Sequence, residues 1–464
     1  FPFSRAMTED LRTQSAQRCR ERDLDGGGRP QPRVRSIDAS TRTASGRAAQ
    51  TASLASAVDA RSAASALRLR RGSSGLQQRQ EACMEDEAAE YSDRFLPGYE
   101  RHRMLGRGAC AVVWLASPEG TSDYVAIKQV IKGTTGKRRS DTEAARKEIF
   151  FGSYLFHPGG APKLPPARYP GMHHVARLLE HEETKRDIWM VMEYGGTCLT
   201  KMAYEIKGEF VRGERIYRVS HLPLVQSMKQ NAQVLKEVLR QLLSALCVLA
   251  EHHIVHSDIK PDNILVEEAD DPQRVRVRFI DLGSAFSFES PENLGIATPE
   301  YMPPEALETC SGRGLPANAG RLSLGLRPPA AGGIGGSRRQ QPVSIAQKLQ
   351  QDAKPWSFDM WSLGAILLEL SIGTPLWMSY KCRVADDQRV HSASTGLFAV
   401  PGRDAEKIIA RQSDVLRQKG LARVLHNAAG VPLSSGPDSG LDLLMAMLTW
   451  EAVDRVSPQA ALEH

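Results

Sequence analysis

The chain has 464 residues, more than one hydrophobic core usually holds, so we expect two lobes together with segments outside them. Its formal net charge is +6, but much of the basic excess lies in residues 29–79, so the charge is no evidence for a nucleic-acid partner. The seven cysteines are scattered without a C-x-x-C pair, which disfavours structural zinc and favours a reducing, intracellular compartment, cytoplasmic or nuclear. No uncharged apolar run reaches the roughly 18 residues that a membrane-spanning helix needs, so we expect a soluble chain.

Residues 1–95 predict a disordered tail. They are rich in Ala, Ser, Arg, Gln and Gly and show no sustained apolar period. Their Arg- and Ser-rich, acid-poor middle is also the composition of an organellar transit peptide. A plain tail is the preferred interpretation, and the transit peptide is the alternative.

A glycine-containing hairpin is the first ordered feature along the chain. Tyr99–Leu105 predicts a strand, Gly106 and Gly108 lie at the turn, and Val112–Leu115 predicts the returning strand. Two glycines at a turn let backbone N–H groups approach phosphate oxygens, although an ordinary hairpin explains the same residues equally well. Val125–Lys128 follows as an apolar alternation that ends in a lysine, at the spacing of a neighbouring strand.

One long helix and two more strands are predicted next. Residues 140–155 predict a helix with its N-cap at residue 140 or 141 and acids in the first turn. The Pro/Gly-rich residues 157–171 predict a loop without regular structure. Val175–Leu179 and Ile188–Tyr194 predict two short strands, which would complete a five-stranded antiparallel sheet.

The second half of the chain begins with a polar stretch and a strongly amphipathic helix. Residues 200–232 predict a short helix followed by an insertion. Asn231 is expected to cap a helix whose apolar residues recur at three- and four-residue steps from Val234 to Leu249. That helix leads directly into the segment His256–Asn263.

The segment His256–Asn263 carries most of the chemistry that the sequence indicates. Pro261 prevents a helix from running through it, so the polar side chains of this loop can converge on one point. A carboxylate at Asp258, an ammonium at Lys260 and a carboxamide at Asn263 indicate phosphoryl transfer, which depends on positioning and charge neutralisation. A hydrogen-bonded turn without catalytic function would explain residues 256–258 but not Lys260 and Asn263.

A second acidic motif follows the predicted strand 275–280. Asp281-Leu282-Gly283 places a carboxylate at a strand end, and oxygen ligands are those that magnesium prefers. The low-complexity residues 311–352 predict a disordered surface loop. Phe358–Leu370 predicts an apolar helix in the core, residues 380–438 predict helices and loops, and residues 439–464 predict a final helical pair.

These motifs, in this order, resemble those of eukaryotic protein kinases over roughly residues 99–464. The similarity rests on Gly106-x-Gly108, Val125–Lys128, His256–Asn263, Asp281–Gly283, Thr298–Glu305, Asp359–Gly364 and Arg455. It implies an α+β bilobal protein-kinase-like fold with a small antiparallel β lobe containing one helix and a larger, mainly helical lobe. The small lobe would span residues 96–194 with an insertion at 157–171. The large lobe would span 195–464 with insertions at about 205–230 and 311–352.

The resemblance also implies an activity. It predicts a monomeric catalytic domain that transfers the γ-phosphoryl group of ATP, with Mg²⁺, to a serine or threonine of a protein substrate. Lysine two residues after Asp258 is typical of Ser/Thr kinases. The sequences His256–Asn263 and Asp281–Ala285 look similar to the SR-protein and dual-specificity tyrosine-regulated kinases of the CMGC group. A pseudokinase scaffold, a dual-specificity kinase and a small-molecule phosphotransferase are the alternatives.

The resemblance assigns a role to each catalytic residue. Asp258 would accept or orient the substrate hydroxyl proton, and Lys260 would neutralise the transferring phosphoryl group, with Thr298 supporting both. Lys128 would hold the α- and β-phosphates while paired with Glu148, or with Glu143 as the fallback partner. The expected metal ligands are Asn263 and Asp281. The expected nucleotide-binding residues are Leu105, Gly106, Gly108, Val113, Ala126, Lys128, Met192, Glu193, Tyr194 and Leu265.

The sequence departs from the family pattern at four positions. Ala111 replaces the third glycine of the glycine-rich loop, and Leu282 replaces a phenylalanine. Gly152 stands one turn after Glu148, where relatives carry a bulky apolar residue, so either Phe151 fills that space or the assignment of Glu148 is wrong. Ser257 stands where many relatives carry an arginine that clasps a phosphorylated activation loop. We therefore expect activity without phosphorylation of Ser284, Ser287, Ser290 and Thr298.

Overall fold

The computed structural model describes residues 95–108, 111–133, 136–211, 213–267, 274–289, 298–311, 353–378, 382–386, 389–393 and 396–464. The predicted tail and the predicted loop at 311–352 lie outside these residues, apart from residues 95 and 311 at their boundaries. Within the described part of the chain, every helix is too short or too polar to cross a bilayer.

The first compact layer is an antiparallel sheet of five strands, as predicted. The strand order is β1-β2-β3-β5-β4, and each neighbouring pair is antiparallel. The strands are β1 (Tyr99–Arg107), β2 (Ala111–Pro118), β3 (Val125–Ile131), β4 (Leu178–Glu183) and β5 (Asp187–Glu193).

Strand β4 begins later than the sequence predicts. Residues 175–177 were expected to belong to it, but Val175 forms a parallel bridge with Phe279, and Ala176 N donates to the Phe279 carbonyl oxygen at 2.9 Å. Val175 and Ala176 therefore pair with β11 of the larger lobe, whereas the Arg177 carbonyl oxygen accepts from Glu193 N of β5 at 3.0 Å, and β4 runs from Leu178 to Glu183. The shift brings the start of β4 close to the acidic motif after β11.

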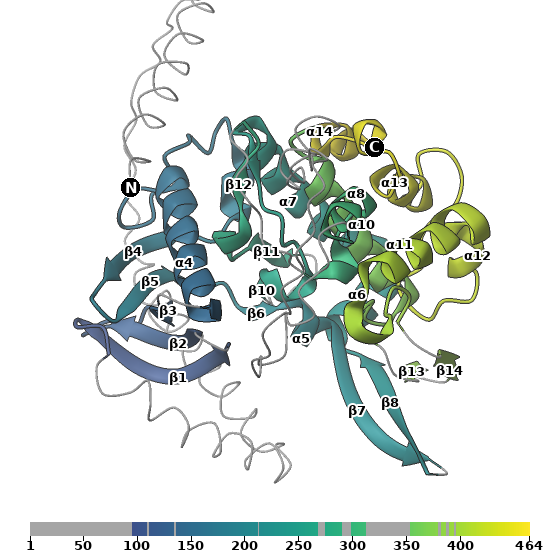
Figure 1. The fold of residues 1–464 in the computed structure, drawn as a ribbon, viewed down its shortest axis with the longest axis horizontal. Helices are drawn as coiled ribbons and strands as arrows, with labels where there is room; N and C mark the ends of the chain where they lie inside the picture. The colour runs from purple at the N-terminus through teal and green to yellow at the C-terminus, as the bar shows by residue number, and fades with distance from the viewer. Residues whose placement is uncertain are drawn as a thin grey trace, which may run out of the picture. The chain divides into compact units, whose positions relative to one another are not determined.

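The helix α4 (Gly136–Leu155) packs along this sheet (Figure 1). It begins four residues before the predicted start, so residues 140 and 141 lie inside the helix and neither is its N-cap. Thr142 Oγ1 accepts from Gly133 N at 3.1 Å and donates to the Arg138 carbonyl oxygen at 2.7 Å. The predicted loop at 157–171 is confirmed except at its end, where the 3-10 helix η3 (Pro170–His174) begins.

The larger lobe is mainly helical and is built around two buried helices. These are α7 (Ala232–Glu251), capped by Asn231 Oδ1 at 3.0 Å from Gln233 N, and α10 (Ser357–Ile372), in which nearly every side chain is buried. Both were predicted from their apolar patterns. The remaining helices are α5 (Leu199–Ala203), α6 (Pro223–Gln230), α8 (Pro304–Ser311), α11 (Ala405–Ser413), α12 (Leu421–Leu425), α13 (Gly440–Met447) and α14 (Pro458–Glu463).

Short strands of this lobe carry the loops of interest. β9 (Ile254–Val255) pairs with β12 (Phe286–Ser287), and β10 (Ile264–Glu267) lies between β11 (Arg276–Phe279) and β6 (Thr197–Cys198). The segment His256–Asn263 therefore joins β9 to β10. The Asp281 motif follows β11 and so lies directly beside that segment.

Two insertions that are far apart in the sequence form one further sheet. It has the order β14-β13-β8-β7, with β13 parallel to β8. Its strands are β7 (Tyr204–Val211), β8 (Glu214–His221), β13 (Cys382–Asp386) and β14 (Arg389–Ala393). The prediction of helices and loops over 380–438 is thus wrong for 382–393, because these residues gain their strand conformation from a partner about 165 positions earlier. Figure 1 shows the β7–β8 hairpin extending away from the helices.

Candidate active site

A lysine of β3, a glutamate of α4 and an aspartate after β11 lie together. Lys128 Nζ donates to Glu148 Oε2 at 2.6 Å and lies 3.5 Å from Asp281 Oδ1. Glu148 is only 5% exposed, so its ion pair is shielded from solvent. The predicted pairing of Lys128 with Glu148 is therefore present. Glu143, the fallback partner, pairs instead with Arg139 on the exposed face of α4, with Nε 3.0 Å from Oε1.

These three charges determine one another's protonation. Burial lowers the pKa of Lys128 more than any other single influence, but the carboxylates of Asp281 and Glu148 together outweigh it and leave that pKa above its usual value. Burial raises the pKa of Glu148 to about 6, against the attraction of Lys128. The charge of Lys128 holds the pKa of Asp281 below its usual value. At neutral pH the ammonium group of Lys128 therefore lies between the carboxylates of Glu148 and Asp281.

Gly152 lies where α4 passes close to β4. A Cβ on Gly152 would lie 2.9 Å from Leu178 Cδ2 and 3.0 Å from Leu178 Cβ, closer than side chains normally approach. Leu178 thus occupies the space that a bulky residue at 152 would fill. Phe151 is buried in the same core cluster as Leu282. Neither predicted alternative holds, because Phe151 does not replace the missing side chain and Glu148 still faces Lys128.

The side chains of the loop 256–263 converge on Asp258. Lys260 Nζ lies 2.7 Å from Asp258 Oδ2 and 3.1 Å from Thr298 Oγ1. Asn263 Nδ2 donates to the Asp258 carbonyl oxygen at 2.8 Å and to Asp258 Oδ2 at 3.0 Å. These two bonds use both amide hydrogens of Asn263, so its Oδ1 is the atom that is left to bind a cation.

The backbone of this loop is held by the N-terminal part of α10. Asp359 Oδ2 accepts from His256 N at 2.8 Å, and Asp359 Oδ1 accepts from Ser257 N at 2.9 Å. The imidazole Nε2 of His256 lies 3.0 Å from the Ile280 carbonyl oxygen, immediately before Asp281. One buried carboxylate therefore fixes two loop amides, and one histidine joins the loop to the Asp281 motif.

Asp281 itself adopts an uncommon backbone conformation. Its φ is +66°, in the left-handed region, and its Oδ1 accepts from Gly283 N at 3.2 Å. A non-glycine residue held in this region is often associated with function. Asp281 and Asn263 together offer a carboxylate and an amide oxygen, which is a donor set that fits Mg²⁺.

The predicted nucleotide-binding residues of the small lobe share one face of the sheet. Val113 lies directly opposite Lys128, and Ala126 lies directly opposite Met192. Residues 126 and 128 are two positions apart on β3, so all four side chains point to the same side. On β1, Gly106 pairs with Val113, which places Gly106 and the preceding Leu105 next to this group.

The glycine-rich turn leaves room above that face. Gly108 N donates to the Ala111 carbonyl oxygen at 2.7 Å, while residues 109 and 110 lie outside the described chain. A Cβ on Gly106 would meet nothing within 4 Å. Its backbone conformation therefore does not require glycine, and the space beside it is open.

A short connection after β5 joins the two lobes near Leu265. Gly196 has φ +96°, and a Cβ there would lie 2.1 Å from the Val266 carbonyl oxygen, so only glycine fits. At Gly195 a Cβ would lie 3.1 Å from Leu265 Cδ1. Leu265 is therefore next to the connection that Glu193 and Tyr194 begin, and its role in nucleotide binding stays a prediction.

Comparison with known families agrees with this geometry. Residues 99–325 match the family model described as the protein kinase domain. This stretch of the chain is similar to protein kinase domains. The matched residues include the glycine-rich turn, Lys128, Glu148, the loop 256–263 and Asp281.

The kinase domain is similar to several curated proteins. A serine/threonine-protein kinase named atg1 from Neosartorya fischeri is 28% identical over 283 residues, which cover 60% of this chain and 26% of the relative. The protein of that name from Komagataella pastoris is 29% identical over 294 residues, covering 61% and 30%. A protein from Arabidopsis thaliana described as a probable inactive protein kinase is 24% identical over 236 residues, covering 44% and 54%. The chain thus spans less than a third of these two atg1 kinases and about half of the Arabidopsis protein.

A buried ion pair stabilises the kinase domain beneath the site. Arg455 donates to Glu305 through both guanidinium amines, with Nη1 2.6 Å from Oε1 and Nη2 2.8 Å from Oε2. The side chain of Arg455 is fully buried. The pair ties the segment that starts at Thr298 to the C-terminal helices.

Sequence reasoning missed the arginines that hold Glu193. Arg177 Nε and Nη2 lie 2.9 Å and 3.1 Å from its two carboxylate oxygens, and Arg278 Nη2 lies 3.4 Å from Oε1. The side chain of Glu193 is thereby directed at these arginines, which leaves its backbone as the part that could bind a nucleotide. Neither arginine lies in a motif, so nothing in the sequence pattern indicated this contact.

Proposed function

We propose that this domain transfers the γ-phosphoryl group of Mg-ATP to serine or threonine hydroxyls of a protein substrate. The observation that carries the proposal is the arrangement of five side chains from three separate segments. Lys128 of β3 lies 3.5 Å from Asp281 after β11, and in the loop 256–263 both Lys260 and Asn263 contact the carboxylate of Asp258.

The geometry suits each group to one task. Asp258 lies with Oδ2 between the ammonium of Lys260 and the amide of Asn263, which hold its carboxyl group in place to accept a hydrogen bond from a substrate hydroxyl. Lys260 lies beside that carboxylate, where it can neutralise charge on the transferring group. Lys128, held by Glu148, provides a second cation on the nucleotide side.

Asn263 and Asp281 are the residues that would hold magnesium. The metal supplies charge neutralisation for the phosphates when it is bound. The ionised state of Asp281 suits this role, since the Lys128 charge lowers the pKa of its carboxyl group. Gly283 N orients the same carboxylate.

The decisive test compares the wild-type protein with Asp281→Asn. Transfer of radiolabelled phosphate from ATP to generic protein substrates should fall at least about a hundredfold in the variant, because a charged metal ligand is lost from the transition state. Asp123→Asn is the matched control, since Asp123 lies exposed in the β2–β3 connection. Equal transfer by wild type and Asp281→Asn, or none by the wild type with added magnesium, would exclude the proposed activity.

A pseudokinase scaffold is the second candidate. The similarity to a protein described as a probable inactive kinase favours it, as do Ala111 and Leu282 at positions where the family pattern has other residues. The intact set of charged side chains favours an active enzyme. Nucleotide binding without phosphate transfer would identify the scaffold. A small-molecule phosphotransferase would label small acceptors rather than proteins.

The finer assignments are also proposals. The similarity to the SR-protein and dual-specificity tyrosine-regulated kinases rests on residues 256–263 and 281–285, and the relatives described above carry other names. Phosphoamino-acid analysis of the labelled substrate separates Ser/Thr transfer from dual specificity. We further propose that the catalytic domain acts as a monomer in the cytoplasm or nucleus, which fractionation and sizing of the native protein would test.

A further inference from the structure

The position of α4 decides whether Glu148 can reach Lys128. Glu148 is carried by the helix, and Lys128 by the sheet, so their 2.6 Å contact exists only while α4 lies close against β3. Any contact that holds α4 in this place therefore also holds the lysine that the proposed reaction needs.

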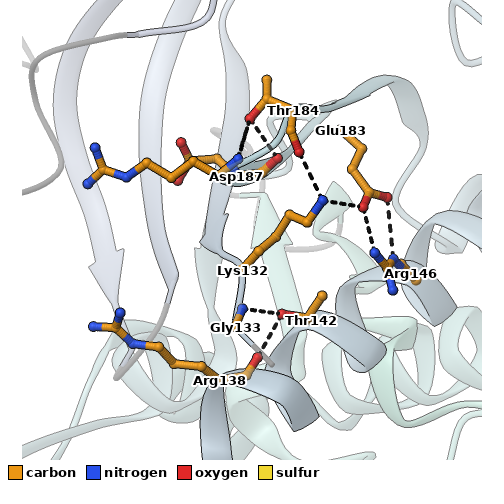
Figure 2. A network of polar contacts seen from close by, with 9 residues as sticks. Lys132, Gly133, Arg138, Thr142, Arg146, Glu183, Thr184 and Asp187 are labelled. Atoms are coloured by element: carbon orange, nitrogen blue, oxygen red, sulfur yellow. Dashed lines mark hydrogen bonds and ion pairs between the residues drawn. The ribbon is translucent and has the colours of Figure 1, made fainter. Parts of the chain in front are cut away.

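Figure 2 shows such a contact at the end of the sheet. Glu183, the last residue of β4, binds two cations from different elements. Its Oε1 lies 2.7 Å from Lys132 Nζ, just after β3, and 2.7 Å from Arg146 Nη2 on α4. Arg146 Nε lies 3.4 Å from the other carboxylate oxygen. We call Lys132, Arg146 and Glu183 the Glu183 cluster.

The cluster and the Lys128–Glu148 pair join the same two elements at different points. Arg146 and Glu148 are two residues apart, which places them about 200° apart around the helix. Lys132 and Lys128 are four residues apart along β3 and its extension. A rotation or outward swing of α4 would therefore have to break both connections at once.

Lys132 and the turn that follows Glu183 are also fixed by hydrogen bonds. Lys132 Nζ also donates to the Thr184 carbonyl oxygen at 2.9 Å. Thr184 Oγ1 accepts from Asp187 N at 2.9 Å, which closes the turn between β4 and β5 (Figure 2). Hydrogen bonds from Arg146 and from Lys132 lower the pKa of Glu183 to about 2, so it is a carboxylate throughout the neutral range.

We propose that Glu183 is a positioning residue, which holds α4 through Arg146 and β3 through Lys132 so that Glu148 keeps Lys128 directed at the nucleotide. This inference rests on the proposed kinase function and assigns to it a residue outside the nucleotide site. Glu183 touches neither the substrate nor the reacting atoms, and its effect passes through α4.

The test compares Glu183→Gln and Arg146→Gln with Arg139→Gln. The last is the matched control, because Arg139 also forms an exposed ion pair on α4 but only with Glu143 of the same helix. We expect kcat/KM for ATP to fall about three- to tenfold in Glu183→Gln and Arg146→Gln at low salt, with the KM for ATP raised. The double variant should lose little more than either single variant, because both remove the same contact.

Two further measurements separate positioning from a general loss of stability. Backbone amides of residues 140–155 should exchange hydrogen faster in Glu183→Gln than in Arg139→Gln. The difference in kcat/KM between Glu183→Gln and the wild type should become smaller in about 0.5 M salt, because salt screens the exposed ion pairs of the wild type. A Glu183→Gln variant that matches Arg139→Gln in both exchange and KM would overturn the proposal, as would a lower unfolding temperature with an unchanged KM. Hydrogen exchange does not require activity, so wild-type protein that transfers no phosphate would contradict the proposed function and leave this test intact.

Discussion

At the scale of single residues, Glu369 is a buried carboxylate that joins distant parts of the large lobe. It is 2% exposed in α10, and its Oε2 accepts from Tyr301 Oη at 2.5 Å and from Leu376 N at 2.9 Å. Tyr301 belongs to the segment 298–305. The backbone carbonyl oxygen of Glu369 accepts from the hydroxyl of Tyr204, the first residue of the β7–β8 hairpin, at 3.2 Å. Burial raises the pKa of Glu369 from 4.5 to about 7.

This pKa predicts a pH dependence of stability. The folded protein binds the Glu369 proton more tightly than the unfolded chain does, so the stabilisation is complete below pH 4.5 and is lost as the pH rises through 7. The loss amounts to roughly 3 kcal/mol of unfolding free energy. Glu369→Gln, which cannot ionise, should remove this part of the slope in urea unfolding measured between pH 4.5 and 8.

The control for this prediction is Glu143→Gln on the exposed face of α4. It should leave the pH slope of the wild type unchanged, because Glu143 is largely exposed and paired only with Arg139. Parallel stability profiles for Glu369→Gln and the wild type across pH 4.5–8 would show that Glu369 keeps an ordinary pKa.

At the scale of elements, the contact between α4 and β4 depends on the absence of a side chain at Gly152. Gly152→Val should force α4 away from Leu178, because even the Cβ would lie 2.9 Å from a Leu178 methyl carbon. We expect a loss of about 1–3 kcal/mol of stability from overpacking and a clear fall in kcat/KM for ATP, since Glu148 moves with the helix.

Shortening the opposing side chain should reverse part of this effect. Gly152→Val combined with Leu178→Ala should recover activity relative to Gly152→Val alone, although Leu178→Ala itself leaves a cavity. Gly440→Ala is the control, because the nearest atom to a Cβ there is 3.4 Å away. Full activity of Gly152→Val would mean that α4 tolerates displacement without losing the Lys128–Glu148 pair.

Elements were predicted well where one continuous pattern defines them. The helices α7 and α10 follow from apolar residues in their own sequence, and the N-cap at Asn231 follows from local chemistry. The sheet β14-β13-β8-β7 was missed for the opposite reason. Strand β13 is only five residues long and gains its hydrogen bonds from β8, so its own residues carry too weak a pattern to show it.

At the scale of the whole molecule, the loop 256–263 is held by hydrogen bonds to α10 and to the segment after Asp281. Ser257 has φ +66°, its N–H donates to Asp359, and its Oγ donates to the Ser284 carbonyl oxygen at 3.2 Å. These bonds join the loop to α10 and to the segment after Asp281. A serine at this position contributes no charge that could bind a phosphate.

We therefore predict that the dephosphorylated protein keeps most of its activity. Treatment with a broad-specificity phosphatase, checked by mass spectrometry at Ser284, Ser287, Ser290 and Thr298, should leave phosphate transfer to a protein substrate close to that of untreated enzyme. Ser290 lies outside the described residues, and Thr298 Oγ1 accepts a hydrogen bond from Lys260 Nζ. Loss of turnover after dephosphorylation would show that the enzyme requires phosphorylation even though it has serine at position 257.

The sequence by itself determined the motifs and their order. Each of these features is encoded by one short continuous stretch of sequence, because turn residues and apolar periodicity act locally. They are the loop 256–263, the acid after β11, the glycine-rich turn and the two core helices. These stretches were enough to predict the bilobal α+β fold and the residues of the candidate site.

Only the tertiary structure decided which of these residues touch. In the folded chain Lys128 pairs with Glu148 and not with Glu143. Leu178 fills the space beside Gly152, and β4 starts later than the sequence predicts. Glu183 lies between Lys132 and Arg146. Each of these outcomes depends on the register between elements that are distant in the sequence. That register is set by packing of both partners together, and neither partner's sequence contains it alone.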